Sequence, residues 1–327
     1  MPCLFTTCSY PTEVFRLVIS LISVYVYHYV WDSFVFRPFT SHLIKKKVLA
    51  STLDDKCRES LWKNVAVLTF FLFGLSIGWN ETWFMNRNEY FLNWPTPTSE
   101  ALKWYYALYG GFWLQGIDFI LSLSGVYYKV KRKDNSEMLL HHASTLFLMI
   151  FSYSIDFTRV GLCVLMIHDI NDLLMETAKF FVYIEWKKTA DVIFATFAVV
   201  WYALRWYFYT YSFVLGVYYD AHEQLYLKIY NQGGFAGYSP NFWYAVWASF
   251  VALMTILLLL HIFWGYLIGQ MVVKALVAGS VEKDIRSDSD EDDTTTEVKR
   301  SSEKKSVKQR KTTKSSSRTT NNTIKIN

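Results

Sequence analysis

Long apolar stretches, each close to the roughly 20 residues that an α-helix needs to cross a bilayer, constrain this chain more than any other feature. Bounded by charged residues, the stretches lie near residues 13–36, 61–79, 101–128, 138–155, 158–183, 190–215 and 242–270. The composition agrees, because 52% hydrophobic and only 19% charged residues are too apolar for an ordinary soluble domain. We therefore predict an all-α fold, a polytopic membrane helical bundle of about seven spans.

The first stretch is interpreted as an anchor that the mature protein retains. Glu13 and Arg16 stand near its start, and neither a basic leader nor a small-residue cleavage site is evident. A cleaved signal peptide is the alternative. The four cysteines of the chain show no CxxC pair, so the sequence favours neither a disulfide scaffold nor a thiolate metal site.

Basic residues beside the spans predict the orientation of the chain. Clusters at residues 45–47, 129–133 and 187–188, and in the C-terminal tail, all fall on one side, which the positive-inside rule makes cytoplasmic. The segments expected on the lumenal side are the N-terminus and residues 80–100, 156–157 and 216–241. The tripeptide beginning at Asn80 is an N-glycosylation acceptor and falls on this lumenal side, in agreement with the charge pattern.

The chain is predicted to have four parts: an N-terminal lumenal end and anchor span (1–36), a cytoplasmic connection (37–60), a membrane domain (61–275) and a disordered cytoplasmic tail (276–327). From about residue 280, Ser, Thr, Lys and Asp replace the aromatic residues, so this part cannot bury a core. Ser287 and Ser289 each precede an acidic residue by three positions, which is typical of phosphorylation sites for acidophilic kinases. A solvated tail with incidental serines is the alternative.

Ionisable residues concentrate in the fifth predicted span. The segment HDINDLLMETAK contains His168, Asp169, Asp172, Glu176 and Lys179. Spacings of three and four residues place these side chains on one stripe of a helix. An ionised side chain at the centre of a membrane helix costs about 2.5–3.5 kcal/mol on insertion scales, so we expect the stripe to face a cavity. For Glu176 and Lys179, an ion pair that only holds the bundle together is an equally good interpretation.

A histidine pair, His141 and His142, lies about one turn inside the fourth predicted span. The short connection to the fifth span makes the two spans antiparallel neighbours, so the pair can face His168, Asp169 and Asp172. We predict one buried pocket that opens toward the cytoplasm. Polarity at the membrane interface is the simpler explanation of the pair taken alone.

Three kinds of chemistry could use such a pocket. A membrane di-iron oxygenase needs more histidines than the seven that this chain contains. A proton-coupled transporter could use buried His and Asp side chains as a relay, but the paired broken helices of transporters are absent from the pattern. Acyl transfer fits best, because a neutral imidazole beside a carboxylate can take a proton or accept an acyl group.

The segment from Lys131 to Phe180 resembles the longevity-assurance motif of the ceramide synthases, within the TLC-domain membrane family. The shared elements are, in order, KRKD, the HH pair, FSY, the step from Arg159 to Gly161, HD, a further Asp, and ExxK ending at Lys179. KCRESLWKN, which begins at Lys56, resembles the stretch before the second span of that family. The resemblance covers roughly residues 50–295.

This resemblance implies an endoplasmic-reticulum enzyme that transfers a fatty acyl group from acyl-CoA to the amine of a sphingoid base. Acyl-CoA is then a co-substrate, with no permanently bound cofactor and no metal. His141 and His142 match the essential histidine pair of the family, and His168, Asp169 and Asp172 match the acidic motif that follows. We expect His141 to be the acyl acceptor or first base, His142 and His168 to position groups or move protons, and the two Asp residues to orient an imidazole and bind the amine.

The remaining expectations concern supporting residues and partners. Arg159, Glu176 and Lys179 are expected to bind substrate or support the structure. The expected partners are the two substrates, membrane lipids, and a related synthase in a homo- or heterodimer. Residues 37–60 are too few for the homeobox-like domain of some relatives, so no nucleic-acid partner is expected. A non-enzymatic TLC-type protein that transports or senses lipids is the alternative function, although such proteins lack the HH and HDxxD patterns.

Overall fold

The structure, a computed structural model, describes residues 10–121 and 135–278. Every element of regular structure in these two ranges is helical, apart from an isolated bridge between Phe235 and Tyr238. The predicted all-α fold is therefore confirmed. Predictions on the first nine residues, on the basic cluster at 129–133 and on the tail serines Ser287 and Ser289 lie outside the described residues.

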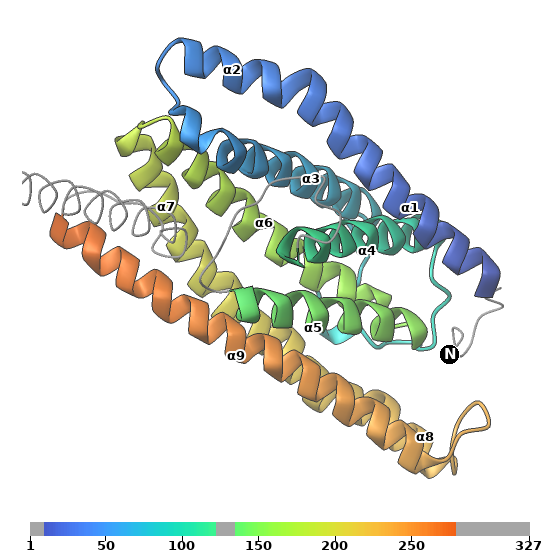
Figure 1. The fold of residues 1–327 in the computed structure, drawn as a ribbon. Helices are drawn as coiled ribbons and strands as arrows, with labels where there is room; N and C mark the ends of the chain where they lie inside the picture. The colour runs from blue at the N-terminus through green and yellow to red at the C-terminus, as the bar shows by residue number, and fades with distance from the viewer. Residues whose placement is uncertain (1–9, 122–134, 279–327) are drawn as a thin grey trace, which may run out of the picture. The chain divides into compact units, whose positions relative to one another are not determined.

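Seven continuous helical rods follow one another in the described residues (Figure 1). Their elements are α1 (Tyr10–Trp31), η1 (Asp32–Phe36) and α2 (Arg37–Lys45) in the first rod; η2 (Ser51–Leu53) and α3 (Asp54–Gly78) in the second; α4 (Glu100–Leu121), α5 (Asn135–Ser154) and α6 (Thr158–Tyr183) as single rods; α7 (Lys187–Trp201), η4 (Tyr202–Val214), η5 (Gly216–Tyr226) and α8 (Leu227–Asn231) in the sixth; and α9 (Pro240–Ala278) in the last. A short 3₁₀ turn, η3 (Arg87–Glu89), lies between α3 and α4. Each predicted span overlaps one rod.

Four of the rods are long and apolar enough to cross a membrane. These candidates are Pro11–Lys45, Ser51–Gly78, Lys187–Asn231 and Pro240–Val277. The other three rods, α4, α5 and α6, have 22, 20 and 26 residues, so they are long enough to cross. They fall short in apolarity, and α6 in particular carries the ionisable stripe of the predicted site. The count of seven spans therefore stays a prediction.

Two connections are shorter than the sequence predicts. The first helix does not end near residue 36 but continues to Lys45, and α3 begins at Asp54. The sixth rod continues to Asn231, so the lumenal connection expected over 216–241 is reduced to residues 232–239. In both places the helix continues beyond the end of the apolar stretch, although several of the added residues have low helix propensity, so packing rather than propensity sets these helix ends.

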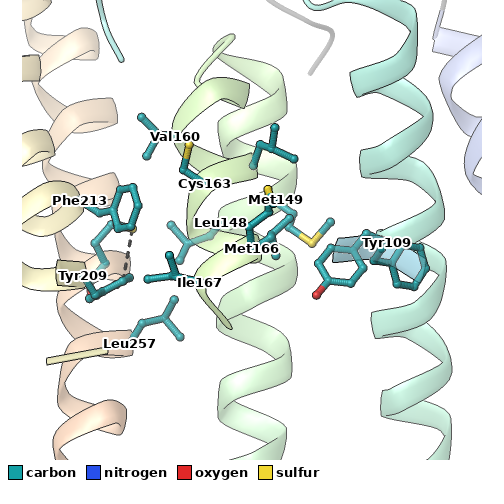
Figure 2. Packing of buried hydrophobic residues seen from close by; sticks show 14 of the residues in the cluster. Tyr109, Leu148, Met149, Val160, Cys163, Met166, Ile167, Tyr209, Phe213 and Leu257 are labelled. Carbon is teal, nitrogen blue, oxygen red and sulfur yellow. Dashed lines mark hydrogen bonds between the residues drawn. The ribbon is translucent and has the colours of Figure 1, made fainter. Parts of the chain in front are cut away.

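The inner helix of the bundle is α6, which packs against α3 and α7. Helix α1 packs along α4, and α9 packs along η4 and η5. Figure 2 shows Tyr109 on one side of α6 and Tyr209, Phe213 and Leu257 on the other. Apolar side chains thus cover α6 on both sides, and its polar residues are enclosed.

The sixth rod has wide, π-helical turns between Tyr202 and Tyr226, interrupted at Leu215. One row of buried side chains recurs at every fourth position, namely Arg205, Tyr209, Phe213, Val217, Ala221 and Leu225, and Ser212 is buried beside it. In an ideal α-helix with 3.6 residues per turn, a repeat of four would drift steadily around the helix. The looser winding lets one straight face of this rod stay packed against α9. π-Helical turns of this kind are frequent at functional sites.

Candidate active site

A buried cavity lies between α4, α5, α6 and α9, and two of the predicted site histidines line it. Its walls are Trp113 from α4; His141, Thr145, Leu148, Met149 and Ser152 from α5; Val160, Gly161, Val164, Leu165 and His168 from α6; and Phe250, Met254 and Leu257 from α9. His141 and Ser152 are eleven residues apart on one helix, so the cavity extends about 16 Å along α5. His141 and His168 are at one end, and the walls beyond them are mostly apolar.

Two of the three predicted histidines are held in a fixed tautomer by their own helices. Nδ1 of His142 is 2.8 Å from the carbonyl oxygen of Met138, and Nδ1 of His168 is 2.6 Å from that of Val164. A carbonyl can only accept, so both Nδ1 atoms carry the proton and donate it. In the neutral rings Nε2 therefore keeps the lone pair. His141 differs, because its Nδ1 is buried with no hydrogen-bond partner among the described residues.

His168 is paired with a histidine that the sequence motifs do not include. Nε2 of His168 lies 2.9 Å from Nε2 of His261, a fully buried residue of α9. Because His168 already donates through Nδ1, its Nε2 accepts, and His261 donates through Nε2. Nδ1 of His261 is then an acceptor, and it has no partner in the described part of the chain. The pair links α6 to α9 beside the cavity.

The two predicted carboxylates have different surroundings. Asp169 is fully buried, and its Oδ1 accepts a hydrogen bond from the hydroxyl of Tyr109, while its Oδ2 has no partner among the described residues. Asp172 accepts a hydrogen bond of 2.6 Å from Nη2 of Arg205. The same Nη2 donates to the carbonyl oxygen of His168 at 3.1 Å. Asp172 is thus neutralised by a buried guanidinium, whereas Asp169 retains an oxygen for another donor.

Arg205 is the central cation of this region. It is 3% exposed, and its guanidinium lies over the ring of Trp201 at 4.2 Å from the centroid. The π-helical turn beginning at Tyr202 carries it into contact with α6. Sequence reasoning did not single out Arg205, although a lone arginine in an otherwise apolar predicted span is a signal of a buried ion pair.

The remaining predicted site residues lie away from the cavity walls. Glu176 accepts hydrogen bonds from the hydroxyl of Ser60 at 2.6 Å and from Lys179 at 3.0 Å, so it links α6 to α3. This arrangement fits the structural role that the sequence left open for Glu176 and Lys179. Arg159, at the opposite end of α6, donates to the carbonyl of Leu92 at 3.2 Å.

The glycosylation candidate Asn80 is exposed at the turn that follows α3. Thr82, the third residue of the acceptor tripeptide, is also exposed, and its hydroxyl donates a hydrogen bond to the carboxylate of Glu89. The position is therefore accessible in the folded chain.

Within residues 10–121 and 135–278, no three His, Cys, Asp or Glu side chains gather closely enough to hold a metal ion. The cavity end instead presents the imidazoles of His141 and His168, whereas Asp169 with its open oxygen and the ion-paired Arg205 lie nearby but are not among the wall residues. Such groups can accept a proton, form a covalent bond through nitrogen, and orient an amine.

Comparison with known families agrees with the motif and the fold. The TLC domain family model matches residues 56–270, which is well over half of the chain. This chain belongs to the TLC-domain family. The resemblance inferred from the HH and HDxxD patterns is thereby confirmed. Both histidines of the pair and both acidic residues lie inside the matched region.

Several relatives of known name are similar to most of this chain. Ceramide synthase LOH2 of Arabidopsis thaliana is 33% identical over 272 residues, covering 80% of this chain and 86% of the relative. Ceramide synthase hyl-2 of Caenorhabditis elegans is 30% identical over 291 residues, covering 86% and 84%. Human ceramide synthase 4 is 33% identical over 240 residues, which span 73% of this chain and only 55% of the human protein. Together with the apolar rods, these matches identify a multi-pass membrane protein.

Proposed function

We propose that this protein is a ceramide synthase, which transfers a fatty acyl group from acyl-CoA to the amine of a sphingoid base and releases CoA. The observation that supports this most strongly is His141, the first residue of the HH pair, at the polar end of a buried cavity with mostly apolar walls. The relatives named ceramide synthase support the same activity. We place the protein in the endoplasmic-reticulum membrane, with the C-terminus in the cytoplasm.

The acyl chain occupies the cavity, and His141 accepts the acyl group. The unprotonated nitrogen of the neutral His141 ring attacks the thioester carbonyl carbon, the C–S bond breaks, and the sulfur leaves as CoA thiol after taking up the imidazole proton. The amine of the sphingoid base then attacks the acyl-imidazole. The amide forms as the C–N bond to His141 breaks, and the proton lost by the amine restores the neutral imidazole.

The neighbouring polar residues divide the supporting work. His142 and His168 donate their Nδ1 protons to backbone carbonyls, which fixes the orientation of both rings, and the Nε2 lone pair of His168 accepts from His261. Asp169, with an open Oδ2, is suited to hold the ammonium form of the incoming base. Asp172 acts on Arg205 and through it on the backbone at His168, and therefore positions the histidine rather than the amine.

The test uses purified protein in detergent, sphinganine, and a series of acyl-CoAs of increasing length, with products analysed by mass spectrometry. Wild-type protein should form the N-acyl product and free CoA, whereas His141→Ala should form neither. His222→Ala is the matched control, because His222 contacts Tyr226 and Trp247 and lies outside the cavity walls. A wild-type protein that binds both substrates and makes no amide would contradict the proposal.

A non-enzymatic lipid carrier or sensor is the second candidate. The mostly apolar cavity supports it, because such walls bind a lipid chain whether or not chemistry follows. Lipid transfer between vesicles that proceeds without acyl-CoA, and that His141→Ala leaves unchanged, would favour this candidate over the enzyme.

The proposed orientation can be tested at Asn80. Expression in cells with a glycosylating lumen should give a glycosidase-sensitive band, which Asn80→Gln should remove. A glycan on an acceptor engineered into residues 129–137 would instead place that connection in the lumen and invert the topology.

A further inference from the structure

Two buried indole rings flank His141, and neither indole N–H has a partner among residues 10–121 and 135–278. The rings of Trp113 from α4 and Trp264 from α9 contact the His141 ring, with centroids 5.4 and 5.2 Å away and interplanar angles of 77° and 88°. The two tryptophans are 8% and 4% exposed. In the described part of the chain, neither Nε1 makes a hydrogen bond. Burying an unpartnered donor costs about 1–3 kcal/mol, so its presence at two adjacent positions needs an explanation.

A third donor lies one helical turn from His141. Thr145 is 6% exposed and lines the cavity, and its hydroxyl has no hydrogen-bond partner among the described residues. A threonine in a helix commonly donates to the carbonyl four residues earlier, as Thr69 does to Val65. Thr145 does not, so its hydroxyl is available to a ligand beside His141.

Six other tryptophans, three of them buried, two half-buried and Trp206 exposed, behave differently. Their indole N–H groups donate to a side-chain or backbone oxygen: Trp62 to Gln115, Trp83 to Glu81, Trp94 to Ile155, Trp206 to His261, Trp243 to Phe235 and Trp247 to Val217. One further unpartnered indole, that of Trp201, lies beneath the guanidinium of Arg205. Unpartnered indoles therefore concentrate where the chemistry is proposed.

The missing partner of these donors is a hydrogen-bond acceptor. An indole N–H can only donate, so a ligand that satisfies two indoles must offer an oxygen with free lone pairs. The proposed reaction places one such oxygen beside His141, namely the carbonyl oxygen of the acyl group. That oxygen becomes negatively charged each time a nucleophile adds to the carbonyl carbon, and donors fixed in a dry site stabilise the charge.

We propose that the Trp113 and Trp264 indole N–H groups, with the Thr145 hydroxyl, form the oxyanion hole of this enzyme. When nitrogen of His141 bonds to the carbonyl carbon, the C=O π pair moves onto oxygen and these donors bind it; the pair returns as the C–S bond breaks. The same donors bind the oxygen again when the amine adds and His141 leaves. This inference rests on the proposed function and assigns two residues outside the motif segment, Trp113 and Trp264, and one within it, Thr145.

The test removes the indole N–H of Trp113 or Trp264 and keeps an aromatic ring at the same position. At position 264, the benzothiophene analogue of tryptophan has the same bicyclic shape and lacks only the N–H; Trp113→Phe and Trp264→Phe are the genetically simple versions. The expected result is a fall in kcat of about 100-fold for each lost donor, with KM for acyl-CoA changed less than about threefold. Trp247→Phe is the matched control on the same helix, because its N–H donates to the carbonyl of Val217 at 2.9 Å. Its kcat should stay within about threefold of wild type.

The outcomes separate this inference from the proposed function. Wild-type activity combined with an unchanged kcat in the 264 analogue and in Trp113→Phe would overturn the oxyanion hole and leave the acyltransferase standing. A rise in KM with an unchanged kcat would also overturn it, since the indoles would then only help to bind the substrate in its ground state. Absence of amide formation by the wild-type protein would contradict both the oxyanion hole and the proposed acyltransferase function.

Discussion

Two buried polar clusters in this molecule differ in how completely their hydrogen bonds are satisfied. In the first, between η1 and α3, Asp32 accepts from Nε and Nη2 of Arg58, both at 2.7 Å, and from Nε of Arg37 at 2.8 Å. The second is the set of polar groups around His141. There, His141, Thr145 and the two indoles have buried donor or acceptor atoms without a partner in the described residues.

The difference separates structure from function. A buried charge is retained for stability only when its partners are present, which is the case for Asp32. A buried donor left open destabilises the folded protein by itself and is retained where a ligand completes it. The saturated hydrogen bonds of Asp32 therefore indicate a structural role for the η1–α3 cluster, and the open donors and acceptors support the proposal that substrate binds at the His141 cluster.

The largest expected effect is on the rate of acyl transfer at the His141 cluster. His141→Ala should lower acyl transfer by more than about 1,000-fold, because the acyl acceptor is removed, while membrane insertion and abundance stay close to wild type. Activity in microsomes and the amount of protein in the membrane fraction measure the two quantities. If His141→Ala made normal ceramide, the functional interpretation of the open cluster would be wrong.

The saturated cluster should show the opposite response. Arg58→Met removes the buried guanidinium that donates two hydrogen bonds to Asp32, whose side chain is 2% exposed, whereas the Arg37 partner that stays is 61% exposed. We expect a loss of about 3 kcal/mol of unfolding free energy, with kcat at a permissive temperature within about threefold of wild type. Thermal unfolding in detergent measures the loss. A stable but inactive Arg58→Met would show that this joint also serves catalysis.

An isosteric change at Thr145 should separate stability from activity within one residue. Thr145→Val removes a buried hydroxyl that has no partner in the described chain, so the folded protein should become more stable by up to about 1 kcal/mol. Activity should fall about tenfold or more, because a donor to the acyl oxygen is lost. The melting temperature and kcat are measured on the same preparation. A decrease in both would mean that the hydroxyl is structurally required.

The smallest effect is expected at Asp156, a half-satisfied carboxyl in the turn between α5 and α6. Burial raises the pKa of Asp156, against the opposing effects of a Thr98 hydrogen bond and of Lys103. The folded protein therefore favours the protonated, neutral carboxyl. The contribution of Asp156 to the free energy of unfolding is greatest below its ordinary pKa of 3.8 and is lost as the pH rises through the raised pKa of the folded state.

Asp156→Asn should therefore leave stability unchanged at acidic pH and increase it near pH 7. The residue has φ of 57°, a left-handed conformation that asparagine tolerates well. Melting temperatures of the two proteins across this pH range give the comparison. A variant less stable than wild type at neutral pH would show that the charge of Asp156 is needed.

Sequence reasoning located the helices and the polar stripe because both depend on local pattern. Apolar blocks predicted each rod, and three- and four-residue spacings placed His168 and Asp169 on the enclosed side of α6. The pairing of α5 with α6 followed from their short connection, so His141 and His168 were expected in one cavity, and the structure places both in its walls.

The partners on other helices could not be predicted in the same way. His261 is separated from His168 by 93 positions, and Arg205 from Asp172 by 33, so no local spacing relates them. The wide turns of the sixth rod, which bring Arg205 to α6, depend on packing against neighbouring helices rather than on the propensity of single residues. The predicted ends of the first and sixth rods were wrong for a related reason, because the helices continue through polar residues in α2 and α8, beyond the apolar stretches.

The four-residue repeat of buried positions from Arg205 to Leu225 restricts how the length of this rod can change. One inserted or deleted residue would turn every side chain beyond it by about a quarter of a turn around the axis, and would move the buried side chains off the packed face. Insertions of four residues would instead preserve the face and displace the far end of the rod by about one turn. Homologues with rods of different length should accordingly differ here in multiples of four.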